Sequence, residues 1–71
     1  MKYIKEFIDM VKKKYPNIII EYNYELVEDM HWIYHNSYGL EFESSTFHTY
    51  IGGLMKKLFF ANDIFNVSFC Y

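Results

Sequence analysis

This chain contains very little of several residue types on which small proteins often depend. Its 71 residues include one cysteine, one proline and one alanine, and neither arginine nor glutamine. The lone Cys70 excludes an internal disulfide framework, and no group of Cys and His has the spacing of a zinc site. No apolar run reaches the roughly 18 residues of a membrane span, and the N-terminal segment is charged and amphipathic, unlike a signal peptide. These absences predict a cytoplasmic protein with no metal and no cofactor.

Aromatic residues, by contrast, are abundant. Phe, Tyr and Trp make up 23% of the chain, and the hydrophobic fraction of 52% is too high for a disordered segment. Codons rich in A and T encode Phe, Tyr, Ile, Asn, Lys and Met, so the bias of a low-GC genome explains part of the excess. We expect one compact domain over residues 1–71. A domain of this size has a small core, which must rely on large aromatic side chains or on a second copy of the chain.

Two stretches of the chain predict helices. Over residues 2–14 apolar side chains recur every three or four positions, and three lysines occupy the last turn, where the helix dipole favours cations. A second apolar stripe of helical period follows Ser44 and Ser45, which are good N-cap residues, and runs to about residue 60. A glycine pair interrupts this second stripe, and we expect it to mark close packing on the sheet or a bend: Gly52 and Gly53.

Four other stretches alternate between apolar and polar residues, which predicts strands over 17–27, 30–35, 38–43 and 65–71. The element order αβββαβ predicts a two-layer α+β domain. In that domain a three-stranded meander and a C-terminal strand form a mostly antiparallel sheet, and two helices cover one of its faces.

The register of this sheet depends on the length of its turns. Turns of odd length at both reversals would place side chains of the second and third strands on the core side of the sheet together with Tyr22 and Tyr24: Trp32, Tyr34, Leu40 and Phe42. A turn of even length would reverse the face on which the second strand places its aromatics.

Charge is distributed unevenly along the sequence. Residues 1–14 sum to +3, whereas residues 15–50 contain no Lys or Arg and sum to −6. The carboxylates of this middle segment are expected to lie on the sheet face opposite the aromatics: Glu21, Glu25, Glu28, Asp29, Glu41 and Glu43. Such a face either keeps the sheet solvated and its edges unpaired, or docks on a basic surface of a partner.

Candidate catalytic groups are few and poorly matched. Two of the histidines, His31 and His35, lie four positions apart on one strand, about 13 Å from each other, so they cannot share a metal ion. A pairing of His48 with Cys70 lacks a third group to orient the histidine. Close pairs of glutamates arise routinely from strand alternation. We therefore expect all three histidines to be surface or half-buried polar residues, and the protein not to be an enzyme.

Exposed strand aromatics also occur in proteins that bind single-stranded nucleic acid, where they stack on bases. The missing arginine and the acidic sheet both oppose phosphate binding. The element order is similar to that of double-stranded RNA-binding domains, which carry a basic cluster at the start of their second helix. This chain has Ser44, Ser45 and Thr46 there, so direct nucleic-acid binding is disfavoured.

These observations together favour a small non-catalytic protein-binding module. Phages and mobile elements encode proteins of this size and charge as inhibitors or adaptors, some of which mimic nucleic acid and fill basic grooves of their targets. The expected partner is a basic or nucleic-acid-handling protein, and no membrane is involved. Two alternatives stay open. One is a homodimer that buries exposed aromatics or the last strand against a second copy, and the other is a single-strand binder that uses aromatics of the first two strands: Tyr22, Tyr24, Trp32 or Tyr34.

Overall fold

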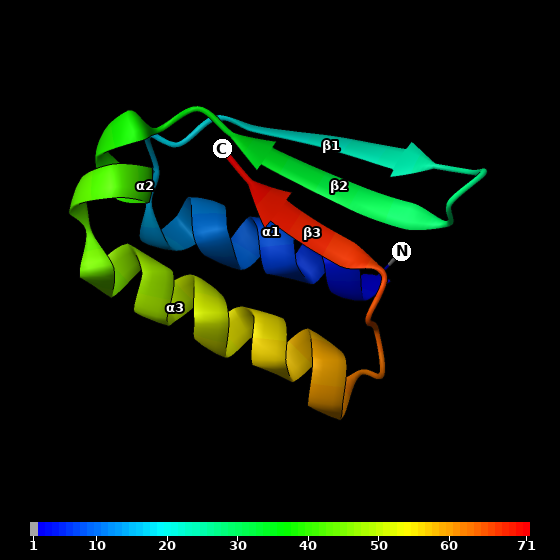
Figure 1. Ribbon diagram of the computed structural model, residues 1–71. Coiled ribbons are helices and arrows are strands. Elements are labelled where there is room, and N and C mark those ends of the chain that lie inside the picture. Colours follow the sequence, from blue (N-terminus) through cyan, green and yellow to red (C-terminus); the bar gives the residue numbers. More distant parts are fainter. Residues whose placement is uncertain (1) are drawn as a thin grey trace.

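The structure is a computed structural model that describes residues 2–71. Helices and strands follow one another in the order α1 (Lys2–Lys14), β1 (Ile20–Glu25), β2 (Met30–His35), α2 (Tyr38–Glu43), α3 (Ser45–Lys56), the π-helical segment η1 (Lys57–Ala61) and β3 (Val67–Cys70). The predicted α+β class is confirmed. Helices α1 and α3 lie on the same side of the sheet, and α2 lies beyond one of its ends (Figure 1).

The sheet has three strands in the order β1-β2-β3 and is mixed. Strands β1 and β2 form an antiparallel hairpin, whereas β3 runs parallel to β2. The prediction of a mostly antiparallel sheet built on a three-stranded meander is therefore wrong. Strand β3 is parallel to β2 because the long helical connection after β2 returns the chain to the end of the sheet where β2 begins, as a parallel pair requires.

The predicted strand over residues 38–43 is a helix, α2, so the element order is αββααβ. Ser37 caps this helix, because its Oγ accepts a hydrogen bond from the Leu40 N–H (3.3 Å) and its carbonyl accepts one from the Glu41 N–H (3.0 Å). Apolar alternation here amounts to Leu40 and Phe42 alone, and Phe42 stays 62% exposed. Local capping outweighs an alternation that buries so little apolar surface.

Both predicted helices are present, and together they build the core. Helix α1 spans the predicted residues and buries one apolar stripe, while α3 starts where Ser44 Oγ accepts a hydrogen bond from the Phe47 N–H (3.1 Å). The core joins these helices to the sheet through buried side chains of α1, β2, α3, η1 and β3: Ile4, Phe7, Val11, Ile33, Phe47, Ile51, Leu54, Leu58 and Val67. Packing of this kind removes apolar surface from water and is the main stabilising term of the fold.

The glycine pair in α3 is not a site of close packing. A Cβ atom built on Gly52 or Gly53 would meet no other heavy atom within 4 Å, so the close-packing interpretation is wrong. Both residues lie in regular helix with negative φ angles. Each therefore lowers the helix propensity without a compensating contact.

The turn between β1 and β2 decides the register of the hairpin. It contains four residues, Leu26 to Asp29, which is an even number. Tyr22 pairs with Ile33 and Tyr24 with His31, so both tyrosines face the helices. Trp32 and Tyr34 consequently point to the opposite face, which is the outcome expected for a turn of even length.

Candidate functional site

The candidate site is the sheet face that points away from α1 and α3. Strand pairing places side chains from all three strands on it, and we call this set the outer face: Glu21, Asn23, Glu25, Met30, Trp32, Tyr34, Ser68 and Cys70. Among residues 2–71 no helix covers this face (Figure 1). An uncovered face with large apolar side chains is the feature of this fold best suited to contact another molecule.

Two aromatic rings occupy the centre of the outer face. Trp32 and Tyr34 lie side by side on β2, with ring centroids 6.2 Å apart and planes inclined by 13°. Tyr34 is 38% exposed and Trp32 is half-buried. The Trp32 Nε1–H donates a hydrogen bond to Glu25 Oε2 (3.4 Å), so a carboxylate lies directly beside the indole. The expectation that the acidic residues face away from the aromatics is thus wrong for Trp32 and Tyr34, because the even turn places both rings on the face that carries Glu21 and Glu25.

Charge separates between the two layers of the protein. The hairpin, residues 20–35, carries Glu21, Glu25, Glu28 and Asp29 and no lysine, and β3 has no charged side chain. All seven lysines lie on α1 or at the junction of α3 with η1, where Lys56 ends α3 and Lys57 begins η1. The sheet layer is therefore acidic and the face of the helical layer that carries α1 is basic. We call the four hairpin carboxylates the acidic face.

The other two predicted site residues lie elsewhere. Glu41 and Glu43 belong to α2 rather than to a strand, and α2 lies at the far end of β2 from the hairpin turn (Figure 1). Six strand residues, about 20 Å, separate α2 from the turn that carries Glu28 and Asp29, whereas Glu21 pairs with Tyr34 near the α2 end of the hairpin. The expectation that Glu41 and Glu43 lie on a strand of the acidic sheet surface is wrong, because both belong to a helix.

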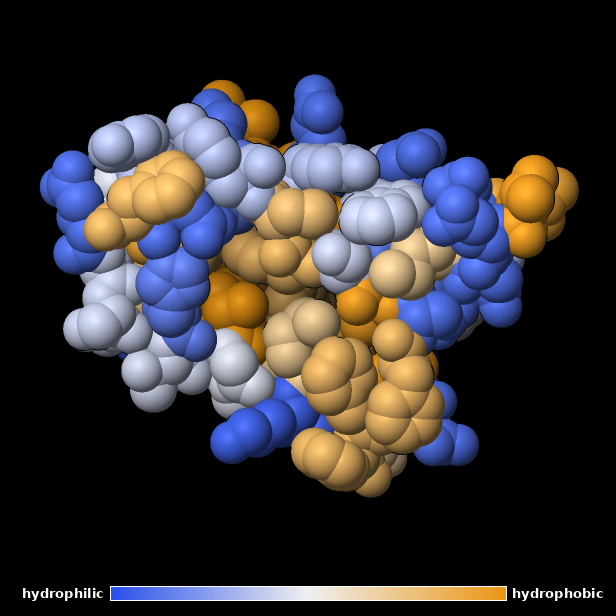
Figure 2. Space-filling model, viewed as in Figure 1, coloured by the Kyte–Doolittle hydropathy of each residue, from blue (hydrophilic) through white to orange (hydrophobic). Residues whose placement is uncertain are grey.

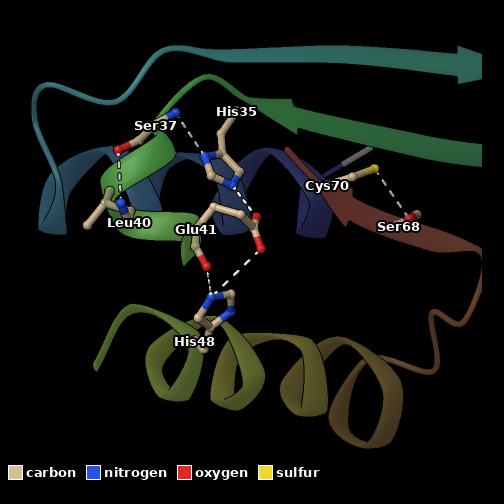
Figure 3. A network of polar contacts seen from close by, with 7 residues as sticks. All are labelled: His35, Ser37, Leu40, Glu41, His48, Ser68 and Cys70. Carbon is tan, nitrogen blue, oxygen red and sulfur yellow. Dashed lines mark hydrogen bonds and ion pairs between the residues drawn. The ribbon is translucent and has the colours of Figure 1, made fainter. Parts of the chain in front are cut away.

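Glu41 is instead part of a polar network between β2, α2 and α3 (Figure 3). His35 Nδ1 accepts a hydrogen bond from the Ser37 N–H (3.2 Å), so His35 carries its hydrogen on Nε2 and donates it to Glu41 Oε1 (2.8 Å). His48 Nε2 donates to the Glu41 carbonyl and lies 3.7 Å from Glu41 Oε2. The His35 side chain is fully buried, so this network holds α2 and α3 to the sheet and offers no access to a substrate.

A second polar pair lies at the other end of the inner sheet face. A hydrogen bond of 2.5 Å joins Tyr22 Oη to His31 Nδ1, and the Tyr24 ring packs against the same imidazole at 4.9 Å. Burial raises the pKa of Tyr22 above its ordinary value. The hydrogen bond from Tyr24 Oη to Asp29 Oδ1 (2.5 Å), followed by burial, raises the pKa of Tyr24. These tyrosines are therefore occupied within the hairpin and are not partners of Trp32 and Tyr34.

The histidines differ from expectation. They were predicted to be surface or half-buried residues, but His31 and His35 are buried, with 2% and 5% exposed. Each satisfies its buried ring nitrogen through a partner from another segment, which is the condition for burying an imidazole. No sequence signal pointed to these pairs, because the His35 partner becomes available only when residues 38–43 form a helix.

Neither a metal site nor a membrane span is found in the described part of the chain. Within residues 2–71, no three His, Cys, Asp or Glu side chains are grouped so that they could hold a metal ion. None of the helices there has the length and apolar character that crossing a membrane requires.

Comparisons with protein-family models, curated proteins and solved structures give no match.

Proposed function

We propose that this protein is a small non-catalytic protein-binding module whose outer face docks on a basic surface of a partner protein. The observation that carries the proposal is the acidic face: the hairpin carries four carboxylates and no cation, and two of these carboxylates, Glu21 and Glu25, share the outer face with the uncovered rings of Trp32 and Tyr34. Large aromatic side chains give much contact area at low entropic cost, and tyrosine and tryptophan are enriched at protein interfaces.

Charge supports a basic partner over an acidic one. Glu21 and Glu28 are exposed and have no hydrogen-bond or ion-pair partner among residues 2–71, so both carboxylates are free to meet cations. A surface of one sign attracts an oppositely charged partner and raises its association rate, and salt weakens that attraction over a Debye length of about 8–10 Å. A groove that normally binds phosphate groups has the required charge, so an inhibitor or adaptor of a nucleic-acid-handling protein is the class we propose.

The same face argues against direct binding of single-stranded nucleic acid. Trp32 and Tyr34 would be the stacking rings, but Glu21 and Glu25 lie on the same face and would repel the phosphate backbone. Tyr22 and Tyr24, which were expected to join them, point to the other side of the sheet.

The proposal is tested by capture of partners from nuclease-treated lysate of the source organism, with a pair of matched variants. One variant carries Glu21→Lys and Glu28→Lys, which reverse two free carboxylates of the acidic face. The control carries Glu6→Lys and Asp9→Lys, which change the net charge by the same amount on exposed positions of α1. Asp29 and Glu25 are left unchanged because they accept hydrogen bonds from Tyr24 and Trp32.

We expect the wild-type protein and the control to retain the same basic protein in stoichiometric amount at low salt and to release it at high salt. The Glu21→Lys, Glu28→Lys variant should lose it. Equal retention by both variants would contradict the acidic-face mechanism, and retention of nucleic acid in place of a protein would favour the single-strand alternative.

A further inference from the structure

Strand β3 is an edge of the sheet that carries none of the usual protection against pairing. Residues 66–71 contain no charged side chain and no proline, and β3 lies at the end of the strand order with only β2 beside it. Strand β1 forms the opposite edge and carries Glu21 and Glu25. Charged edge strands resist pairing with another chain, and uncharged ones permit it. The uncharged β3 edge is therefore able to pair with a strand of another chain, whereas the charged β1 edge resists such pairing.

The hydrogen-bonding pattern shows which groups of β3 are free. His31 N–H donates to the Asn66 carbonyl (2.9 Å), and His31 is the pairing partner of Val67. In a parallel pair this pattern directs the backbone groups of Asn66 and Ser68 toward β2. Because backbone groups alternate along a strand, those of Val67 and Phe69 point away from the sheet. No backbone partner for them is found among residues 2–71.

These free groups allow a self-complementary pairing. In an antiparallel pair of two β3 strands centred on Ser68, Val67 of each copy lies opposite Phe69 of the other, and both residues present their free N–H and C=O groups. The same register places Phe65 opposite Tyr71 at both ends. Phe65 is 61% exposed and Tyr71 is 53% exposed, so each aromatic would gain a cross-strand partner. A register centred between Ser68 and Phe69 is excluded. It would place the free backbone groups of Phe69 in one copy opposite those of Ser68 in the other, which already point toward β2.

We propose that two copies of this chain associate about a twofold axis at Ser68, with their β3 strands antiparallel, and so form a continuous six-stranded sheet. Pairing through β1 would bring Glu21 and Glu25 of two copies together, whereas pairing through β3 places the two acidic faces at opposite ends of the joined sheet. Charge thus selects the β3 edge. The outer face stays open in both copies, so the proposal does not depend on the proposed function.

Apolar surface surrounds the free edge. Figure 2 shows orange and tan atoms in the hollow between β3 and α3, with a further apolar cluster below it. Exposed aromatics lie near both ends of β3: Phe60 and Phe65 follow α3, and Phe42 packs against Tyr71 with ring centroids 5.5 Å apart. A stable dimer buries about 800 Å² on each copy, which is roughly a sixth of the 4908 Å² surface of this chain. A four-residue strand alone is too short for that area, so the flanking aromatics must be part of the contact.

Light scattering of the purified protein, from micromolar to millimolar concentration, tests the association. We expect the mass to rise from that of the 8.7 kDa chain to twice that value. Ser68→Lys should keep the protein monomeric, because it places two like charges directly opposite each other at the axis. Asn23→Lys is the matched control, since it adds the same charge to the outer face on the far edge strand and should leave the dimer intact. A monomer at every concentration, or a Ser68→Lys dimer, would overturn the proposal.

Disulfide trapping tests the register independently. Residues facing each other at a non-hydrogen-bonded antiparallel position have Cα atoms about 4.5 Å apart, within disulfide range. The Ser68→Cys, Cys70→Ser double variant should therefore form a covalent dimer on mild oxidation. Native Cys70 should not, because in this register two copies of it lie four positions apart, about 13 Å. Linkage through native Cys70, or none through Ser68→Cys, would refute the axis at Ser68.

Discussion

Replacing Glu41 by alanine is expected to destabilise the protein by about 1–3 kcal/mol, the cost of leaving a buried donor without an acceptor. His35 is the donor: its side chain is fully buried, its Nδ1 is occupied by the Ser37 N–H, and its Nε2–H has Glu41 Oε1 as its partner at 2.8 Å. The more exposed contact of His48 with the same carboxylate, at 3.7 Å, adds little to this value. In a domain of this length the loss corresponds to a fall in melting temperature of roughly 5–20 °C.

Glu43→Ala is the matched control for this prediction. It removes the same side chain from the same helix at an exposed position, so it should change stability by less than about 0.5 kcal/mol. Urea unfolding followed by circular dichroism gives the free energy of unfolding of both variants. Glu41→Gln should lose less than Glu41→Ala, because the amide oxygen still accepts the His35 hydrogen. Equal stability of the Glu41→Ala and Glu43→Ala variants would refute the role assigned to the network.

Two further predictions concern stability. Gly53→Ala should raise the free energy of unfolding by about 0.5–1 kcal/mol, since the residue is exposed in regular helix with open space around it; a loss measured by urea unfolding would mean that the glycine has a role the packing does not reveal. Burial raises the pKa of Tyr22 above its ordinary value of 10.0. The stabilising contribution of the protonated Tyr22 hydroxyl is therefore complete below pH 10 and is lost as the pH rises through the pKa of the folded state. Between about pH 9 and about pH 11, the urea midpoint should therefore fall less for Tyr22→Phe than for the wild type, and an equal fall would contradict this assignment.

The parts of the fold that depend on local pattern were predictable from the sequence. Helix α1 is defined by its apolar stripe and its terminal lysines, and the hairpin strands by their alternation. Residues 38–43 were misassigned because two alternating apolar residues are also compatible with a short helix. There the Ser37 cap, a single side chain, decides the outcome.

The candidate site depended on a feature that the sequence leaves open. The turn contains four residues, an even number, and this places Trp32 and Tyr34 on the same face of the sheet as Glu21 and Glu25. A turn of odd length would place them on the other face. A change of one residue in a turn reverses every side chain of the following strand, so composition and charge alone could not assign the faces. The same reversal removed Tyr22 and Tyr24 from the site. The helical state of residues 38–43 removed Glu41 and Glu43.

Docking on the outer face can be followed at the centre of that face while a partner binds. Trp32 is the only tryptophan of the chain, so labelling with fluorotryptophan gives a single fluorine signal from the centre of that face. Titration with the captured basic protein at low salt should shift or broaden this signal, high salt should restore it, and Glu21→Lys with Glu28→Lys should abolish the change. An unchanged Trp32 signal at saturating partner would show that binding occurs elsewhere, and would contradict the outer face as the docking surface.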